Sequence, residues 1–250
     1  MLPLGLADPT IKDFAYDRTG FQYSFRPNWL NKPFDNPKVR QALLYAFNQE
    51  EFLRATVGKS YFACGTPFSS ETALEGLLTP DFKKAQELLK EAGYDGTPIV
   101  LLHSTDVASL SNLAPVAKSL MEKAGFRVDM QSMDWQTLVA RRAKKGPPDA
   151  GGWHAFLTAA VAADAANPIF SGFLNSACEK ATFGWPCDPD MESLRDQFAR
   201  ETDPSRTPTY LRGSSSSFVL RNLAESLGLK LWADLPLASL LRLPCPETLG

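Results

Sequence analysis

The chain has 250 residues, and its 26 basic and 28 acidic residues give a formal net charge of −2. This near balance excludes the strongly basic composition by which proteins bind nucleic acid or anionic membranes. A content of 44% hydrophobic and 22% charged residues is typical of a soluble globular protein. The first residues show neither the positive nor the apolar segment of a signal peptide, and no apolar run near the start is long enough to span a bilayer.

The first 36 residues are rich in proline, asparagine, aspartate and aromatic residues. Within them, residues 11–16 and 21–25 alternate between apolar and polar side chains, which predicts two strands. Thr19-Gly20 is the predicted turn between these strands.

Residues 37–57 are predicted to form two consecutive helices. Asn36 can accept hydrogen bonds from the first amides of the first helix, and Pro37 suits its first position. Asn48 is the corresponding cap of the second helix, and Glu51 stands three residues later, where a capping box places its acid.

Residues 79–157 alternate between helical and strand patterns. Thr79 is predicted to cap the first of these helices, which starts at Pro80 and ends before Gly93. The remaining predicted elements are strands at residues 98–103, 126–132 and 153–157 and helices at residues 109–124 and 135–144, the last capped by Asp134. This order predicts an α/β fold with a mainly parallel sheet flanked by helices.

The last part of the chain has two regions of different character. Residues 188–202 are predicted to form a helix capped by Asp188. Residues 205–250 combine a run of four serines with a leucine- and proline-rich end, and we expect them to be the least ordered part of the chain.

Cys178 and Cys187 bracket a short loop that contains a glycine and a proline. A disulfide or two free thiols both fit this spacing, and only a disulfide would imply an oxidising compartment. A zinc site would need further ligands, and His103 and His154 are distant in the sequence.

No motif for a catalytic nucleophile, a phosphate loop, a dinucleotide site or a zinc protease occurs in the sequence. We therefore expect no catalytic residue, no metal site and no cofactor. Both histidines are interpreted as structural residues, and Arg40 as an arginine that binds carbonyl groups or an acid rather than a ligand.

The helical pair in residues 34–52 closely resembles a signature of the substrate-binding proteins of ABC transporters, in the peptide and nickel family known as solute-binding protein family 5. Further similarity lies in residues 85–97 and 124–130, at Trp135 and Trp153, and in the cysteine loop. The resemblance extends from about residue 10 to about residue 204. It implies the second lobe of a periplasmic-binding-protein fold, with hinge-proximal strands in residues 1–36, the C-terminal lobe in residues 37–204, and a divergent tail, either disordered or frameshifted, in residues 205–250.

The resemblance also implies a function. Members of this family capture a peptide or similar small solute between two lobes and present it to a membrane permease, in the periplasm or another extracytoplasmic space, without catalysis. It implies a Cys178–Cys187 disulfide and an unpaired Cys64. Asp164 matches the carboxylate that pairs with the ligand amine, and Trp135 and Trp153 could line the cleft, with a core or boundary role as the alternative for each.

Because the chain departs from the family in two respects, two other interpretations of its function remain. Family members have a further lobe before the region matched here, and the serine run has no counterpart in them. One alternative is therefore a truncated, non-functional gene product. Another is an unrelated small secreted hydrolase, against which the absence of a nucleophile motif argues.

Overall fold

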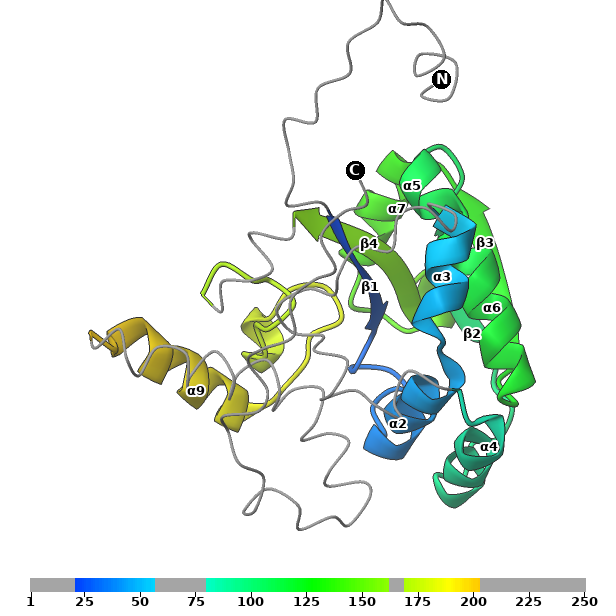
Figure 1. Ribbon diagram of the computed structural model, residues 1–250, viewed down its shortest axis with the longest axis horizontal. Helices are drawn as coiled ribbons and strands as arrows, with labels where there is room; N and C mark the ends of the chain where they lie inside the picture. Colours follow the sequence, from blue (N-terminus) through cyan, green and yellow to red (C-terminus); the bar gives the residue numbers. More distant parts are fainter. Residues whose placement is uncertain (1–20, 57–79, 162–168, 203–250) are drawn as a thin grey trace, which may run out of the picture.

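The computed structural model describes residues 21–56, 80–161 and 169–202. Its centre is a four-stranded sheet in the order β1-β4-β2-β3, with helices packed against it (Figure 1). The strands are β1 (Phe21–Pro27), β2 (Ile99–Ser104), β3 (Val128–Met133) and β4 (Ala155–Val161). β2 pairs in parallel with both β3 and β4, and β1 pairs antiparallel with β4. The predicted α/β class and the mainly parallel sheet are confirmed.

Helices α2, α3, α4 and α6 lie on one side of this sheet (Figure 1). The helices in the described residues are α2 (Pro37–Ala46), α3 (Gln49–Thr56), α4 (Phe82–Glu91), α5 (Ala108–Ser111), α6 (Leu113–Lys123), α7 (Trp135–Arg142) and α9 (Pro189–Arg200), with 3-10 turns η3 (Pro148–Ala150) and η4 (Cys178–Lys180). Helix α9 lies at the opposite side of the molecule from α4 and α6 (Figure 1).

Short-range caps set several helix starts as the sequence predicted. Asn36 accepts a hydrogen bond from the amide of Lys38 at the start of α2. Asp134 accepts one from the amide of Thr137 in α7, and Asp188 caps α9. These caps satisfy amides that have no partner within the helix.

Helix α4 begins later than expected. The predicted cap Thr79 lies outside the described residues, and the helix begins at Phe82 with Asp81 as its cap. The side chain of Asp81 accepts a 2.9 Å hydrogen bond from the amide of Lys84. A carboxylate in this position also carries a charge that favours the positive end of the helix.

The single helix predicted at residues 109–124 is wrong, because α5 and α6 are separated at Asn112. Pro115 has no amide to donate to the carbonyl of Ser111, and its ring crowds that carbonyl. The Ser111 oxygen instead accepts a 2.8 Å hydrogen bond from Nε2 of His103. A side chain from β2 thus supplies the hydrogen-bond donor that the proline cannot provide to this carbonyl.

The predicted hairpin between residues 11–16 and 21–25 has its first strand outside the described residues. Its second strand is β1, which is the edge strand of the main sheet and pairs with β4 from Phe21↔Val161 to Pro27↔Ala155. Pairing with β1 extends β4 to Val161, beyond the predicted end at Leu157. β1 therefore belongs to the same sheet as β2, β3 and β4.

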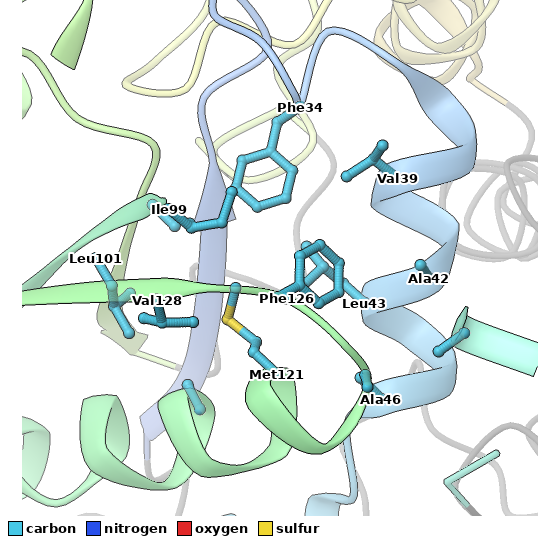
Figure 2. Packing of buried hydrophobic residues seen from close by; sticks show 14 of the residues in the cluster. Phe34, Val39, Ala42, Leu43, Ala46, Ile99, Leu101, Met121, Phe126 and Val128 are labelled. Carbon is cyan, nitrogen blue, oxygen red and sulfur yellow. The ribbon is translucent and has the colours of Figure 1, made fainter. Parts of the chain in front are cut away.

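The two faces of the sheet carry different cores. We call the cluster beneath α2, α4 and α6 the first-face core (Figure 2). Its labelled members are Phe34, Val39, Ala42, Leu43, Ala46, Ile99, Leu101, Met121, Phe126 and Val128. The second-face core consists of Val100, Leu102, Leu138, Trp153, Phe156 and Trp185. Alternate residues of each strand point to opposite faces, which separates the two sets.

Candidate functional site

The strand order places a topological switch point between β2 and β4. The chain runs from β2 through α6 to β3 on one side, and then through α7 to β4 on the other side of β2. α6 contributes to the first-face core and α7 to the second-face core, so the two connections cover opposite faces. In open α/β sheets, ligands bind in the crevice at the carboxyl ends of the strands at such a point.

The carboxyl ends of β2 and β3 are joined by hydrogen bonds. Oδ1 of Asp106, which follows β2, accepts a 3.1 Å bond from Oγ of Ser104 and a 2.8 Å bond from the amide of Trp135. The amide of Thr105 donates a 3.0 Å bond to the carbonyl of Met133. These bonds fix the start of α7 against the end of β2.

Asp134 lies at the same edge and is the cap of α7. Its carboxylate accepts hydrogen bonds from the hydroxyl and from the amide of Thr137, at 2.6 and 3.0 Å. These bonds hold the pKa of Asp134 below its usual range. The side chain is therefore an exposed, ionised cap whose acceptor atoms are committed to the helix.

Polar side chains continue along the second face near this edge. Ser104 and Thr158 are both buried, at 3% and 8% exposure. Thr158 of β4 is paired with Ser24 of β1 and lies two residues beyond Phe156, which pairs with Leu102 of β2. Sequence reasoning missed these residues, although the two-residue alternation in β4 could have found Thr158.

Of the three predicted ligand residues, Trp135 lies at the carboxyl edge. It is the first residue of α7, directly after β3, and is half-buried. Its ring packs against both cores. Asp164 lies outside the described residues, three positions after the end of β4.

Trp153 lies at the opposite, amino edge of the sheet, two residues before β4. It is fully buried in the second-face core, and its Nε1 donates a 3.1 Å bond to the carbonyl of Arg142. Its ring lies 5.0 Å from that of Phe156 and 5.9 Å from that of Trp185. The structure thus separates the two tryptophans and gives Trp153 the core position that the sequence offered as its alternative role.

The loop that packs on the second face is closed by a disulfide between Cys178 and Cys187. Arg26 of β1 anchors this loop by donating to the carbonyl of Phe183 and to Oγ1 of Thr182, and it also donates to the carbonyl of Phe173, which precedes the loop. Burial lowers the pKa of Arg26 to about 10. The predicted bond is present, and Cys64 and Cys245 lie outside the described residues.

The close approach of this loop to β1 requires a glycine. Gly184 has φ +103°, and a Cβ there would lie 2.7 Å from the carbonyl oxygen of Pro27. The carbonyl of Gly184 accepts a 2.8 Å bond from the amide of Trp29. A side chain at this position would push the loop away from the sheet.

Both histidines have structural partners. Nδ1 of His154 accepts a 2.8 Å bond from the amide of Val100, and burial lowers the pKa of the ring. His103 forms hydrogen bonds with Oγ of Ser132 through Nδ1 and with the carbonyl of Ser111 through Nε2.

Arg40 binds backbone carbonyls, as the sequence suggested. Its Nη1 donates to the carbonyls of Phe34 and Asp35, at 2.7 and 3.1 Å, and its Cζ lies 3.5 Å from the ring centroid of Trp29. Burial lowers its pKa to about 10, opposed by the charge of Asp35. Arg40 also lines an open pocket of about 390 Å³ beside the disulfide, at the amino edge of the sheet.

Within residues 21–56, 80–161 and 169–202, no group of three or more histidine, cysteine, aspartate or glutamate side chains is placed to hold a metal ion. None of the helices in these ranges has both the length and the apolar character needed to cross a membrane.

Comparison of the chain with solved structures identifies the fold. A putative peptide binding protein AppA from Clostridium difficile superposes with a TM-score of 0.70 at 15% identity, over 86% of this chain and 45% of that one. AppA from Bacillus subtilis, in complex with a nonapeptide, superposes with a TM-score of 0.58 at 18% identity, over 80% of this chain and 44% of that one.

Comparison with curated sequences gives closer relatives. The chain is 39% identical over 204 residues to the probable peptide ABC transporter periplasmic-binding protein y4tO of Sinorhizobium fredii. This match covers 78% of the chain and 38% of that protein. It is also 35% identical over 138 residues to the glutathione-binding protein GsiB of Salmonella typhimurium, which covers 51% of the chain and 27% of that protein.

The family profile described as bacterial extracellular solute-binding proteins, family 5 Middle, matches residues 4–178. This match covers more than half of the chain and agrees with the relatives and the fold. The alternative of an unrelated hydrolase is thereby set aside. The chain belongs to family 5 of the bacterial extracellular solute-binding proteins.

Proposed function

We propose that the chain is the C-terminal lobe of the substrate-binding component of an ABC transporter that takes up peptides or similar small solutes. The observation that carries this proposal is the 39% identity, over 78% of the chain, to a relative named as a peptide ABC transporter periplasmic-binding protein. The proposed partner is an ABC permease, and the proposed location is periplasmic or otherwise extracytoplasmic. Ligand capture is non-covalent and requires no catalytic group.

We assign the ligand amine to Asp164. Strand β4 ends at Val161 on the carboxyl edge, and three further residues can span at most about 11 Å. Asp164 is therefore within reach of the edge where α/β folds bind ligands. A carboxylate suits this role, because a charge-assisted hydrogen bond to an ammonium group is strong when water is excluded.

The tryptophans have different proposed roles in this site. Trp135 is half-buried at the carboxyl edge and can present part of its ring to a ligand. Trp153 is fully buried. Its proposed contribution is to support α7 from beneath, through the hydrogen bond from its indole to the carbonyl of Arg142.

Affinity for the isolated chain should be low. The chain spans 38% of the length of its relative y4tO. A single ion pair to the ligand amine that stays in contact with water contributes about 0–1 kcal/mol, whereas association costs at least about 4 kcal/mol of lost freedom. We therefore expect a Kd for dipeptides of roughly 1 mM or weaker.

Titration of the 250-residue chain with dipeptides and longer peptides, followed by NMR chemical shifts, tests this function. We expect weak binding that Asp164→Asn reduces further. The matched control is Asp149→Asn, because Asp149 is exposed on η3 at the amino edge. Micromolar binding that survives Asp164→Asn would contradict both the assigned residue and the expected low affinity. A complete lack of peptide binding at high millimolar concentrations would contradict the proposed ligand class.

A further inference from the structure

The disulfide between Cys178 and Cys187 lies at the wall of a pocket. Both cysteines line the open pocket of about 390 Å³ at the amino edge of the sheet. Cys187 is exposed, whereas Cys178 is half-buried. Thiol–disulfide exchange requires that an attacking thiol reach one of the two sulfur atoms. In this disulfide, the exposed Cys187 is the cysteine that a molecule in the pocket can approach.

The pocket has the size and the walls of a small-molecule site. Its volume falls in the range of ligand pockets, and two tryptophans provide apolar walls. The charges around it are balanced, because the carboxylate of Asp35 is close to the guanidinium of Arg40 and Glu179 pairs with Lys145. We therefore expect the pocket to admit a molecule without net charge more readily than an anion or a cation.

The bridged loop, residues 178–187, has further anchors besides the disulfide. The carbonyl of Gly184 accepts the 2.8 Å bond from the amide of Trp29, and the carbonyl of Phe183 accepts bonds from Arg26. The ring of Phe183 also packs against Arg142, whose Cζ lies 4.7 Å from the ring centroid. Opening the disulfide leaves all of these contacts in place.

Backbone contacts also hold the two ends of the bridged loop together. The amide of Cys178 donates a 3.0 Å bond to the carbonyl of Pro186. Ala177 and Cys187 form an antiparallel bridge. After the disulfide opens, these contacts keep the two sulfur atoms close to each other, so that the bond can form again.

We infer that this disulfide is a modification site, at which a small thiol without net charge is attached reversibly to Cys187 of the folded protein. The thiolate of the small molecule attacks Sγ of Cys187 and forms a new S–S bond. The Cys178–Cys187 bond breaks, and its electron pair leaves with Sγ of Cys178, which takes up a proton from water. The small thiol is thereby oxidised to a mixed disulfide, and Cys178 is reduced to a thiol.

The reverse step restores the original bond. Cys178 ionises and attacks Sγ of Cys187, and the small molecule leaves as a thiolate, so no further oxidant is needed. The site lies at the amino edge of the sheet, whereas the proposed peptide site lies at the carboxyl edge. The inference therefore goes beyond peptide capture and does not depend on it.

The rate of exchange in the folded chain tests this inference. The unaltered 250-residue chain is incubated with 2-mercaptoethanol, once in buffer and once in enough urea to unfold it. Acid stops the exchange at timed points, and peptide mapping by mass spectrometry locates the adduct. We expect the adduct on Cys187, with Cys178 as a thiol, and a rate in buffer within about tenfold of that in urea. A disulfide reached only by global unfolding would react at least about a thousandfold more slowly in buffer.

Two single variants form a matched pair, because each removes the disulfide and keeps one of its cysteines. Cys178→Ser leaves Cys187, and Cys187→Ser leaves Cys178. Both are treated with bis(2-hydroxyethyl) disulfide in buffer, and labelling of the remaining cysteine is followed by peptide mapping. Cys187 should be labelled at least about tenfold faster than Cys178. If either variant fails to fold, the unaltered chain decides the question.

The backbone amide of Trp29 reports whether the bridged loop stays in place, because it donates to the carbonyl of Gly184. We expect its NMR signal to stay at its folded position when the adduct forms. An adduct on Cys178, a rate in buffer suppressed by more than about tenfold, or a Trp29 signal at its unfolded position would each overturn the inference. None of these outcomes affects the proposed peptide site at the carboxyl edge.

Discussion

The two faces of the sheet are closed in different ways. The first-face core is covered by helices α2, α4 and α6, whose buried residues are mainly aliphatic. The second-face core is rich in aromatic residues and is covered by α7 and by an irregular loop. That loop is held by a disulfide, by Arg26 and by cation–aromatic contacts. Helices bring their own backbone hydrogen bonds, whereas a covering loop needs outside partners for its carbonyls.

This contrast predicts where the chain is most sensitive to change. On the first face, stability should depend on how completely apolar side chains fill the core. On the second face, it should depend on a few specific bonds made by residues far apart in the sequence.

The largest effect is expected from removing volume in the first-face core. Phe34 is fully buried, and its ring lies 6.5 Å from that of Phe126. Phe34→Ala should lower the free energy of unfolding by about 3–5 kcal/mol, because it leaves a cavity. Urea unfolding measures this change. Phe170→Ala is the control, since Phe170 is 78% exposed and should contribute less than about 0.5 kcal/mol. Similar losses for both variants would contradict the assigned core.

Breaking the disulfide should have the next largest effect. Cys178 and Cys187 are nine positions apart, and closing a loop of this size stabilises a fold by about 2–3 kcal/mol. A reductant should lower the Tm of the unaltered chain. The double variant Cys178→Ser, Cys187→Ser should show the low Tm already and should not respond to the reductant. A response of the double variant would assign the effect to other cysteines.

Loss of the Arg26 anchor should cost somewhat less. Arg26→Met keeps a long apolar stem but leaves the carbonyls of Phe173 and Phe183 without their donor. We expect a loss of about 1–3 kcal/mol in chemical denaturation, the usual cost of buried unpaired polar groups. Arg200→Met on the exposed face of α9 is the matched control. If Arg26→Met matched the stability of the unaltered chain, the covering loop would not depend on this side chain.

The smallest effect is a pH dependence from His154. Burial keeps the pKa of the folded ring below its ordinary value of 6.5, so the unfolded chain takes up the proton first on acidification. Stability should therefore fall as the pH drops through about 6.5, by at most about 1.4 kcal/mol per pH unit for this group. Tm values between pH 7.5 and 5.5 measure the slope. His154→Gln should flatten it, and an unchanged slope in this variant would assign the dependence to other groups.

The candidate site was only partly predictable from the sequence. Trp135 and Trp153 both appeared as aromatic residues near strand ends, and nothing local distinguished them. The crossover through α7 places one at the carboxyl edge and buries the other at the amino edge. The contacts of Arg142 with the rings of Trp135, Phe156 and Phe183 could not be predicted either, because these rings come from α7, from β4 and from the bridged loop.

The sequence by itself determined the elements that depend on near neighbours. Asn36, Asp134 and Asp188 cap their helices through amides two or three residues away. The apolar run of β2 and the alternation of apolar and polar residues in β3 mark strands. These interactions are short-range, so the local pattern contains all of their partners.

Only the tertiary structure decided how the second face is closed. The pairing of β1 with β4, the extension of β4 to Val161 and the anchoring of the bridged loop by Arg26 join residues more than 100 positions apart. Such partners are selected by the shape and the unpaired polar groups of the folded sheet. The residues themselves, read in order, do not identify which distant carbonyl or strand edge they will meet.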